Sequence, residues 1–210
     1  MVENSLLPDE IIFCCFDDEN FSLYQEVYIN QSNHLLSLFA ILASMKITMK
    51  PVASPGAIET VARLAEEIWN EHYVPIIGQE QVDYMVAKYQ SVPAISNQIE
   101  NESYIYFLIF AEAKVVGYVG MQIREQELFL SKYYVHRSQR GKGYGKQALD
   151  FIRQYARERG LKGISLTVNK FNSNSIAAYE KMGFLNLGPT VADIGNGFIM
   201  DDYKMRLPLN

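Results

Sequence analysis

Apolar and polar positions follow two periods along the chain, and their order predicts both strands and helices. Residues 47–52 alternate as a half-buried strand does, and apolar positions then recur at helical spacing over 58–69 and over 82–89. Pro75 and Gly78 interrupt the pattern between the two helical segments. This region therefore predicts one strand followed by two helices.

The second half of the chain alternates more regularly between the two periods. Apolar, β-branched and aromatic runs predict strands over 104–110, 115–123, 128–135, 164–168, 184–191 and 198–207. Helical spacing predicts helices over 144–156, before Gly160, and over 176–182, before Gly183. The order of elements favours a single α/β or α+β domain over residues 47–210, in which a hairpin joins the first two of these strands.

Residues 1–46 differ from this domain in composition. Acidic and aromatic residues dominate 9–28, and the apolar run 35–43 follows without a chemical motif. Two interpretations of this N-terminal extension stay open. It is an accessory helix that packs on the domain or mediates association, for example in a homodimer, or it precedes a natural translation start at Met45 or Met49.

Composition and charge exclude several classes of protein. The 210 residues are 49% hydrophobic and 20% charged, so the chain can bury a full core and is not disordered in bulk. The chain has 24 acidic and 19 basic residues, and this balance disfavours a general nucleic-acid binder. The run 35–43 is shorter than the roughly 20 apolar residues of a membrane-spanning helix, so no membrane partner is expected.

The cysteines and histidines favour a reducing environment and give no sign of a metal site. Cys14 and Cys15 are adjacent, and Cα atoms about 3.8 Å apart are too close for an ordinary disulfide. His34, His72 and His136 are far apart in sequence, and no Cys/His cluster has zinc spacing. The acidic N-terminus also differs from the basic start of a signal peptide. We therefore expect a cytoplasmic protein without a metal.

The strongest chemical signal is a glycine-rich turn between a predicted strand and a predicted helix. It reads Arg140-Gly141-Lys142-Gly143-Tyr144-Gly145-Lys146. Glycine lets a backbone approach a ligand closely, and the free N–H groups and dipole at a helix start favour an anion. The turn therefore predicts a phosphate cradle, and the alternative is an ordinary solvated turn.

Local charge supports the cradle. Between positions 132 and 146 there is no acidic residue, and the basic residues are Lys132, Arg137, Arg140, Lys142 and Lys146. An anionic ligand accounts for such a basic island in an acidic protein. The glycine spacing is G-x-G-x-G, which fits neither the P-loop of nucleotide triphosphatases nor the G-x-G-x-x-G dinucleotide fingerprint.

The turn resembles a loop of the GNAT N-acetyltransferase family. Arg140, Gly143 and Gly145 give the pattern R-x-x-G-x-G, which is similar to the loop that holds the pyrophosphate of acetyl-CoA in that family. Residues 132–135 before it are similar to the central strand of the family. The resemblance covers about 47–208.

Two later segments resemble the same family. Residues 172–184 are similar to its N-x-x-A-x-x-x-Y-x-x-x-G-F motif, with Ser175 where alanine is usual, and residues 201–205 also look family-like. Three motifs in the right order, with the right elements between them, make the resemblance more specific than one motif alone.

The resemblance implies a mixed sheet that splays open at its centre, with acetyl-CoA in the gap and direct acetyl transfer to an amine. It implies that the backbone N–H groups of residues 140–145 hold the pyrophosphate. Main-chain groups at Tyr133 and Val135 would bind the pantetheine arm and polarise the acetyl carbonyl, and Asn172 would touch the cofactor.

The resemblance also implies that Tyr179 protonates the departing thiolate. A phenol with an ordinary pKa of about 10 is protonated at neutral pH and can give that proton. We then expect the rate to fall at high pH as the phenol ionises. The alternative is that Tyr179 is a core aromatic residue at helical spacing.

The group that accepts the proton of the attacking amine is not fixed by the sequence. An alkylamine with a pKa near 10.4 must lose a proton before it attacks, so a carboxylate or histidine should accept it. Histone-type relatives carry a glutamate four residues before the place of Tyr133, where this chain has the apolar Phe129. Glu127 has the same strand parity and is one candidate.

The segment 66–80 supplies the other candidates. Its acidic and aromatic residues suit a cationic amine, and Glu71, His72 and Glu80 are the candidate bases, with Asp193 as a further one. The alternative is that the segment is a solvated helix face.

Two functions of different classes follow. The first is an active N-acetyltransferase that acts on a small amine or an exposed peptide amine. The second is a non-catalytic acetyl-CoA-binding sensor or partner-binding module, because a fold does not fix a function. Release of free thiol in the presence of a panel of amines distinguishes them.

Overall fold

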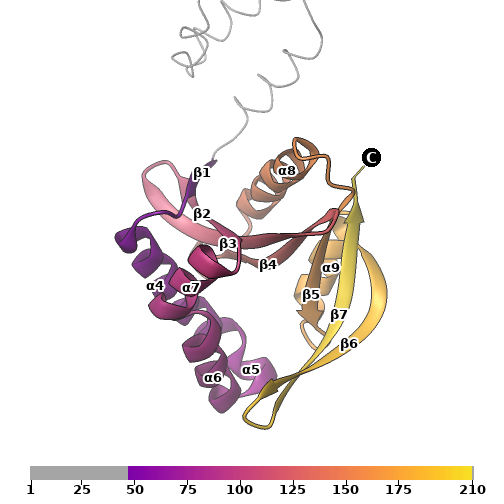
Figure 1. Ribbon diagram of the computed structural model, residues 1–210. Helices are drawn as coiled ribbons and strands as arrows, with labels where there is room; N and C mark the ends of the chain where they lie inside the picture. The colour runs from indigo at the N-terminus through magenta and orange to yellow at the C-terminus, as the bar shows by residue number, and fades with distance from the viewer. Residues whose placement is uncertain (1–46, 210) are drawn as a thin grey trace, which may run out of the picture. The chain divides into compact units, whose positions relative to one another are not determined.

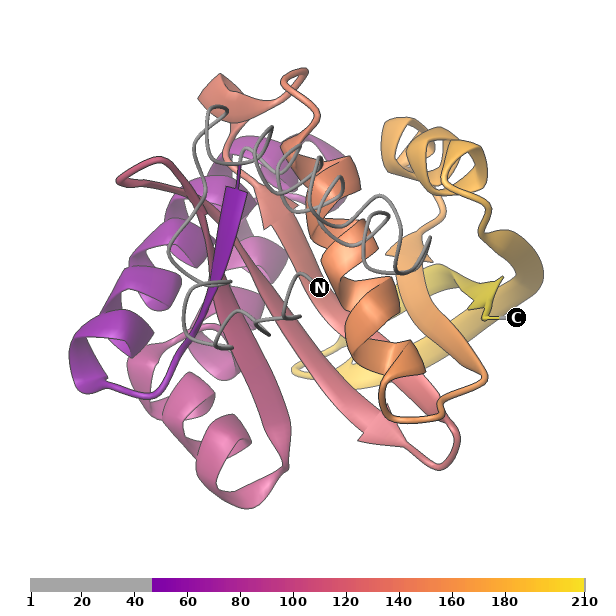
Figure 2. The same ribbon diagram turned by 90° about the horizontal axis from the view of Figure 1, so that it is seen from above.

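The computed structural model describes residues 47–209, which form one mixed β-sheet with helices on both faces (Figure 1, Figure 2). The predictions for residues 1–46 lie outside the described residues. The strands are β1 (Ile47–Pro51), β2 (Tyr104–Ala111), β3 (Lys114–Arg124), β4 (Glu127–Val135), β5 (Gly163–Asn169), β6 (Leu185–Gly195) and β7 (Phe198–Pro208).

The strands follow the order β1-β2-β3-β4-β5-β7-β6, and every neighbouring pair is antiparallel except β4 and β5. The parallel pair joins only residues 127–129 to residues 163–165. Beyond these positions β4 and β5 diverge, as Figure 1 shows. The predicted mixed fold is therefore confirmed, and the sheet opens at its centre.

Helices cover the sheet. They are α4 (Pro55–His72), α5 (Val74–Ile77), α6 (Gln79–Tyr89), α7 (Val92–Asn101), α8 (Tyr144–Arg157) and α9 (Ser173–Lys181), with a 3-10 turn, η1 (Arg137–Gln139). Ser54 caps α4, where its Oγ accepts a hydrogen bond from the Ala57 N–H at 3.3 Å, and Pro55 follows at the first helical position. Gly143 precedes α8 in the left-handed conformation that glycine adopts without strain.

The core has a layer on each face of the sheet. On one face α4, α6 and α7 bury Ile68 and Ile95 against Tyr106 and Tyr118 of the sheet. On the other face α8 buries an apolar stripe of Ala148, Leu149, Ile152 and Ala156, which the helical spacing predicts. These two layers fix the sheet between α4–α7 and α8 (Figure 2).

The sequence missed α7, because its apolar pattern is interrupted. Gln98 lies on the buried face of α7, where it accepts a hydrogen bond from Tyr106 Oη at 2.5 Å and donates one to the Tyr89 carbonyl at 3.0 Å. A buried amide with both ends paired replaces an apolar residue at low cost. The strand β6 also continues to Gly195, beyond the predicted end at residue 191.

None of the helices within residues 47–209 is long and apolar enough to cross a membrane.

Replacing Leu149 by alanine should lower the free energy of unfolding by about 2–5 kcal/mol, because this fully buried side chain of α8 would leave a cavity. Leu187→Ala on β6 is the matched control. That side chain is 53% exposed, so the loss should stay below about 1 kcal/mol. Denaturant titration measures both, and equal losses would contradict the core assigned to α8.

Candidate active site

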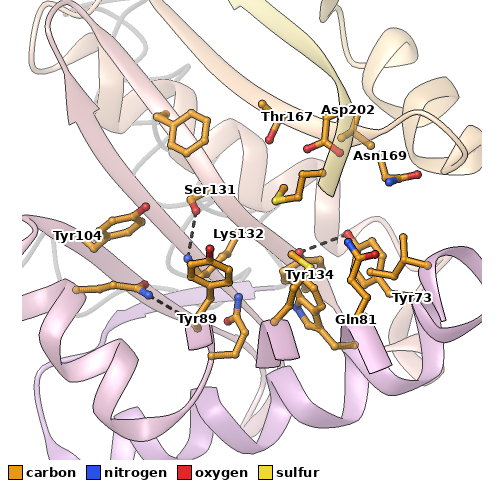
Figure 3. A pocket seen from close by; sticks show the side chains of 18 of the residues that line it. Tyr73, Gln81, Tyr89, Tyr104, Ser131, Lys132, Tyr134, Thr167, Asn169 and Asp202 are labelled. Carbon is orange, nitrogen blue, oxygen red and sulfur yellow. Dashed lines mark hydrogen bonds between the residues drawn. The ribbon is translucent and has the colours of Figure 1, made fainter. Parts of the chain in front are cut away.

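Two cavities meet where β4 and β5 separate. The larger one, of about 550 Å³, runs between β4, α9 and the turn after β4, and we call it the loop groove. The smaller one, of about 330 Å³, lies over α4, α6 and the open end of the sheet, and we call it the tyrosine cavity (Figure 3). Both are lined by Tyr73, Ser131, Tyr134, Thr167 and Val168. A molecule in one cavity can therefore reach a molecule in the other.

The backbone N–H groups of Tyr133 and Val135 face the opening between the strands. The His136 N–H donates to the Val116 carbonyl on β3 at 2.9 Å, and alternate residues of an antiparallel strand face the same partner. Tyr133 and Val135 have the other parity, so their main-chain groups point away from β3. Since β5 pairs with β4 only as far as Phe129, no strand within residues 47–209 covers them.

The glycine-rich turn leads from β4 into α8. Gly141 and Gly143 have positive φ angles of 79° and 82°, and in the described part of the chain no side-chain hydrogen bond caps the start of α8. The N–H groups of the first helical turn therefore point out of the helix without helical partners. The residues from Gly141 to Lys146 follow directly on Arg140, which lines the loop groove.

Two hydrogen bonds fix the turn to β4. Tyr133 Oη donates to the Gly145 carbonyl, and Arg140 Nε donates to the Val135 carbonyl at 3.0 Å. A Cβ at Gly145 would lie in ordinary van der Waals contact with Tyr133 Oη, at 3.5 Å. The start of α8 is thereby held at the open end of β4.

The helix α9 forms the far wall of the loop groove. Asn172 caps it and is 4% exposed; its Nδ2 lies 3.1 Å from His72 Nε2 at the end of α4. Burial and the nearby Arg140 lower the pKa of His72, so its imidazole is neutral at pH 7. Asn172 and His72 thus join α9 to α4 across the groove.

Tyr179 lies on α9 and faces β4. Its ring stacks on that of Tyr133 at 6.3 Å between centroids and contacts Phe184 at 5.5 Å. Burial, followed by the neighbouring Tyr73 and Tyr133, raises the pKa of the Tyr179 phenol well above its ordinary value. The hydroxyl therefore keeps its proton throughout the neutral and mildly alkaline range.

An aromatic wall separates the tyrosine cavity from the core. Tyr73 packs on Trp69 at 4.6 Å between centroids, and its Oη lies 3.4 Å from Tyr134 Oη. Burial raises the pKa of both phenols, so they stay neutral. Figure 3 shows the Tyr73–Tyr134 contact at one side of the cavity.

Two buried charged residues also line the tyrosine cavity. Asp202 of β7 is 4% exposed, and burial raises the pKa of its carboxyl to about 6, against a hydrogen bond from Thr167 that lowers it. Lys132 of β4 is 5% exposed, and burial lowers the pKa of its ammonium to about 8. The sequence analysis counted Lys132 in the basic island of the phosphate cradle, but its side chain lines the tyrosine cavity and not the loop groove. It gave Asp202 no chemical role, because nothing in the local pattern separates this residue from surface charges.

The candidate bases expected from the sequence do not line the tyrosine cavity. Glu71 lines the loop groove and pairs with Arg137 at 3.1 Å, and His72 lines the same groove. Glu80 lies in the first turn of α6, and Glu127 pairs with Arg206 at the closed end of the β4–β5 pair. Neither of these two lines the loop groove or the tyrosine cavity, and Asp193 accepts a hydrogen bond from the Gly195 N–H on β6.

The loop groove fits coenzyme A in its donor set. An anionic pyrophosphate requires N–H donors and positive charge, which the start of α8 and the side chains of Arg137 and Arg140 supply. A pantetheine arm requires main-chain partners along an open strand, and Tyr133 and Val135 offer them. Four residues expected at the cofactor site line this groove, Tyr133, Val135, Arg140 and Asn172, together with Tyr179, the expected proton donor. The expected residues 141–146 are not among its lining residues.

Replacing Gly143 by alanine should weaken coenzyme A binding about tenfold or more, because an L-residue at φ 82° distorts the turn that aims the N–H groups. Gly160→Ala, just after the same helix at φ 67°, is the matched control. It carries similar backbone strain and should leave the dissociation constant unchanged. Calorimetric titration decides, and equal affinities in both variants would contradict the cradle.

Two proteins that are named N-acetyltransferases are similar in sequence to this chain. A spermidine N(1)-acetyltransferase from Thermoplasma acidophilum is 25% identical over 149 residues, which cover 69% of this chain and 89% of the relative. The uncharacterized N-acetyltransferase YhdJ from Bacillus subtilis is 26% identical over 126 residues, which cover 57% of this chain and 87% of the relative.

Solved structures and a family model agree with these relatives. The PaiA N-acetyltransferase from Thermoplasma acidophilum, in complex with coenzyme A, has a TM-score of 0.64 at 22% identity and covers 78% of this chain and 99% of its own. The GCN5-related N-acetyltransferase from Rhodopseudomonas palustris has a TM-score of 0.65 at 15% identity, over 77% and 95%. These likenesses show the fold. The model of the acetyltransferase (GNAT) family matches residues 62–184, more than half of the chain, and the chain therefore belongs to the GNAT family of acetyltransferases.

Proposed function

We propose that this enzyme binds acetyl-CoA in the loop groove and transfers its acetyl group to the primary amine of a small molecule in the tyrosine cavity. Transfer of an acetyl group from acetyl-CoA to an amine is the chemistry of the family. One observation carries the assignment of the two sites: the cavities share their lining where β4 and β5 separate, beside the uncovered main chain of Tyr133 and Val135.

The donor side uses fixed dipoles. Acetyl-CoA supplies a thioester whose carbonyl oxygen gains negative charge as the amine attacks. An N–H group held by a strand costs no reorganisation when that charge develops, and the N–H groups of Tyr133 and Val135 meet this requirement. The start of α8 and Arg140 hold the opposite, anionic end of the molecule.

Tyr179 is the proposed proton donor to the leaving thiolate. It lines the loop groove, and its hydroxyl remains protonated at every pH at which the enzyme is expected to work. The burial that raises its pKa also changes the expected pH profile. An ordinary phenol would ionise near pH 10, and the rate would fall there. With the raised pKa, the fall in rate due to ionisation of Tyr179 moves to higher pH.

Asp202 is the proposed acceptor of the proton from the amine, directly or through one water. It lines the tyrosine cavity on the side where that cavity meets the loop groove, next to Thr167. A pKa of about 6 leaves the carboxylate ionised at neutral pH yet more basic than an ordinary aspartate. Among the candidate bases named above, Glu71 and His72 lie in the loop groove, so neither lines the cavity of the amine.

Release of free coenzyme A thiol in the presence of an amine panel tests the proposal. The panel should contain polyamines, because one relative is named a spermidine N(1)-acetyltransferase, together with small monoamines and peptide amines. Turnover of a small amine is the expected result. Tight coenzyme A binding without turnover of any amine would favour a non-catalytic acetyl-CoA-binding module instead.

Tyr179→Phe should lower turnover about 100-fold while coenzyme A binding is kept, because only the proton donor is lost and the ring still packs on Tyr133. Tyr155→Phe on α8 is the control, since Tyr155 lines neither cavity. Turnover at saturating substrates is measured from pH 7 upward. In the wild type it should not fall through ionisation of Tyr179, because the raised pKa keeps the hydroxyl protonated. Wild-type turnover in Tyr179→Phe would make Tyr179 a packing residue.

Asp202→Asn should remove the acid limb of the pH profile. In the wild type, kcat/KM should rise as pH increases through about 6, because Asp202 loses its proton there and becomes able to accept one. The variant should lack this rise and lose about 100- to 10,000-fold of its rate at pH 7. Asp201→Asn is the matched neighbour, since Asp201 pairs with Lys170 and lines neither cavity. It should keep the acid limb but move it to lower pH, because the charge of Asp201 contributes to the raised pKa of Asp202. An unchanged acid limb in Asp202→Asn would contradict the role of Asp202.

A further inference from the structure

Lys132 brings a buried positive charge to the tyrosine cavity, and the chemistry proposed above does not use it. Its side chain is 5% exposed and lines that cavity but not the loop groove. The ammonium has three donors, and one of them reaches Ser131 Oγ at 3.1 Å. The rings of Tyr104 and Tyr106 lie under it at 4.8 Å and 5.6 Å.

No carboxylate within residues 47–209 pairs with this ammonium. The ion pairs of the described part of the chain do not include Lys132. Glu102 lines the same cavity and favours the charged form from a distance, while Arg124 disfavours it. The Glu102 carboxylate accepts a hydrogen bond from Asn97 Nδ2 at 2.7 Å instead. A buried charge without a paired partner costs stability, so the fold alone gains little from it.

The fold makes room for this lysine. Gly120 lies opposite Lys132 on β3, and a Cβ at Gly120 would lie 3.0 Å from Lys132 Cδ and 2.8 Å from Tyr106 Cε1. The glycine thus lets the aliphatic stem of Lys132 and the Tyr106 ring lie against the main chain of β3. The charged end is held in one place at the cavity wall.

The two buried charges lie on opposite sides of the cavity. Figure 3 shows Lys132 with Ser131 and Tyr104 toward one side, and Asp202 with Asn169 toward the other. A polycation would place a second positive charge near Lys132, which is unfavourable at low dielectric. A molecule with an amine at one end and an anion at the other complements both sides.

We propose that Lys132 selects acceptor amines that also carry a carboxylate, such as amino acids or short peptides, by pairing with that carboxylate inside the tyrosine cavity. The inference rests on the proposed function, since it names the class of acceptor at the same site. Three features carry it: the cavity-lining ammonium, its missing ion pair among the described residues, and the glycine that accommodates its stem.

Matched acceptors test the inference. Each ω-amino acid with one to five methylene groups is compared with its neutral primary amide and with the corresponding aminophosphonate, and spermidine serves as the polycation. In the wild type, kcat/KM should be about 10- to 100-fold higher for the best carboxylate than for its amide, as expected for a buried charge-assisted hydrogen bond. A preference for the aminophosphonate instead would overturn the carboxylate assignment.

Lys132→Met keeps the length of the side chain and removes its charge. The variant should lose the 10- to 100-fold preference for the carboxylate, while its kcat/KM for the amide and its coenzyme A affinity stay within about twofold of the wild type. Retained amide turnover shows that the variant is folded. Lys114→Met is the control, since Lys114 is exposed and lines neither cavity.

A direct binding measurement separates failure of this inference from failure of the proposed function. Calorimetry of the best ω-amino acid in the presence of coenzyme A requires no turnover. If no amine is acetylated but Lys132→Met loses carboxylate binding, the inference stands and the proposed function fails. If amines are acetylated and the carboxylate preference is absent, or equal in Lys132→Met, the inference is wrong; absence of both turnover and binding overturns both.

Discussion

The site depends on one constraint: β4 and β5 pair over only three residues and then separate. Each strand keeps its other neighbour over most of its length, β3 for β4 and β7 for β5, so the sheet stays continuous while its centre opens. The register of β4 against β3 shifts at Ser131, where Leu130 and Lys132 face adjacent residues of β3. Such a bulge bends a strand and increases its twist, which carries the end of β4 away from β5.

Adjacent tyrosines hold the open end of β4 from both faces. Tyr133 bonds to the Gly145 carbonyl at the start of α8, and Tyr134 reaches Tyr73 at the end of α4. Successive side chains of a strand point to opposite faces, so two neighbouring residues can attach the same strand to two helices. The glycine turn and the aromatic wall therefore keep a fixed relation to the uncovered main chain between them.

The tyrosine cavity is lined by two ionisable groups whose pKa values are shifted toward the neutral range by burial. Burial raises the pKa of Asp202 to about 6 and lowers that of Lys132 to about 8. The same desolvation acts in opposite directions because it always disfavours the charged form. Burial of each charged group lowers the stability of the fold. It also strengthens the interaction of the group with a ligand of opposite charge, because charges attract more strongly at low dielectric.

The sequence by itself determined the order of most elements, the glycine turn and the family, because these depend on local periods and on short motifs with fixed spacing. It missed α7, where Gln98 is buried through hydrogen bonds to Tyr106 and Tyr89 that join separate elements. Only the tertiary structure brought Asp202 and Lys132 into one cavity. They are 70 positions apart on strands that are not neighbours, and the cavity that both line lies where β4 and β5 separate, which no local pattern of residues encodes.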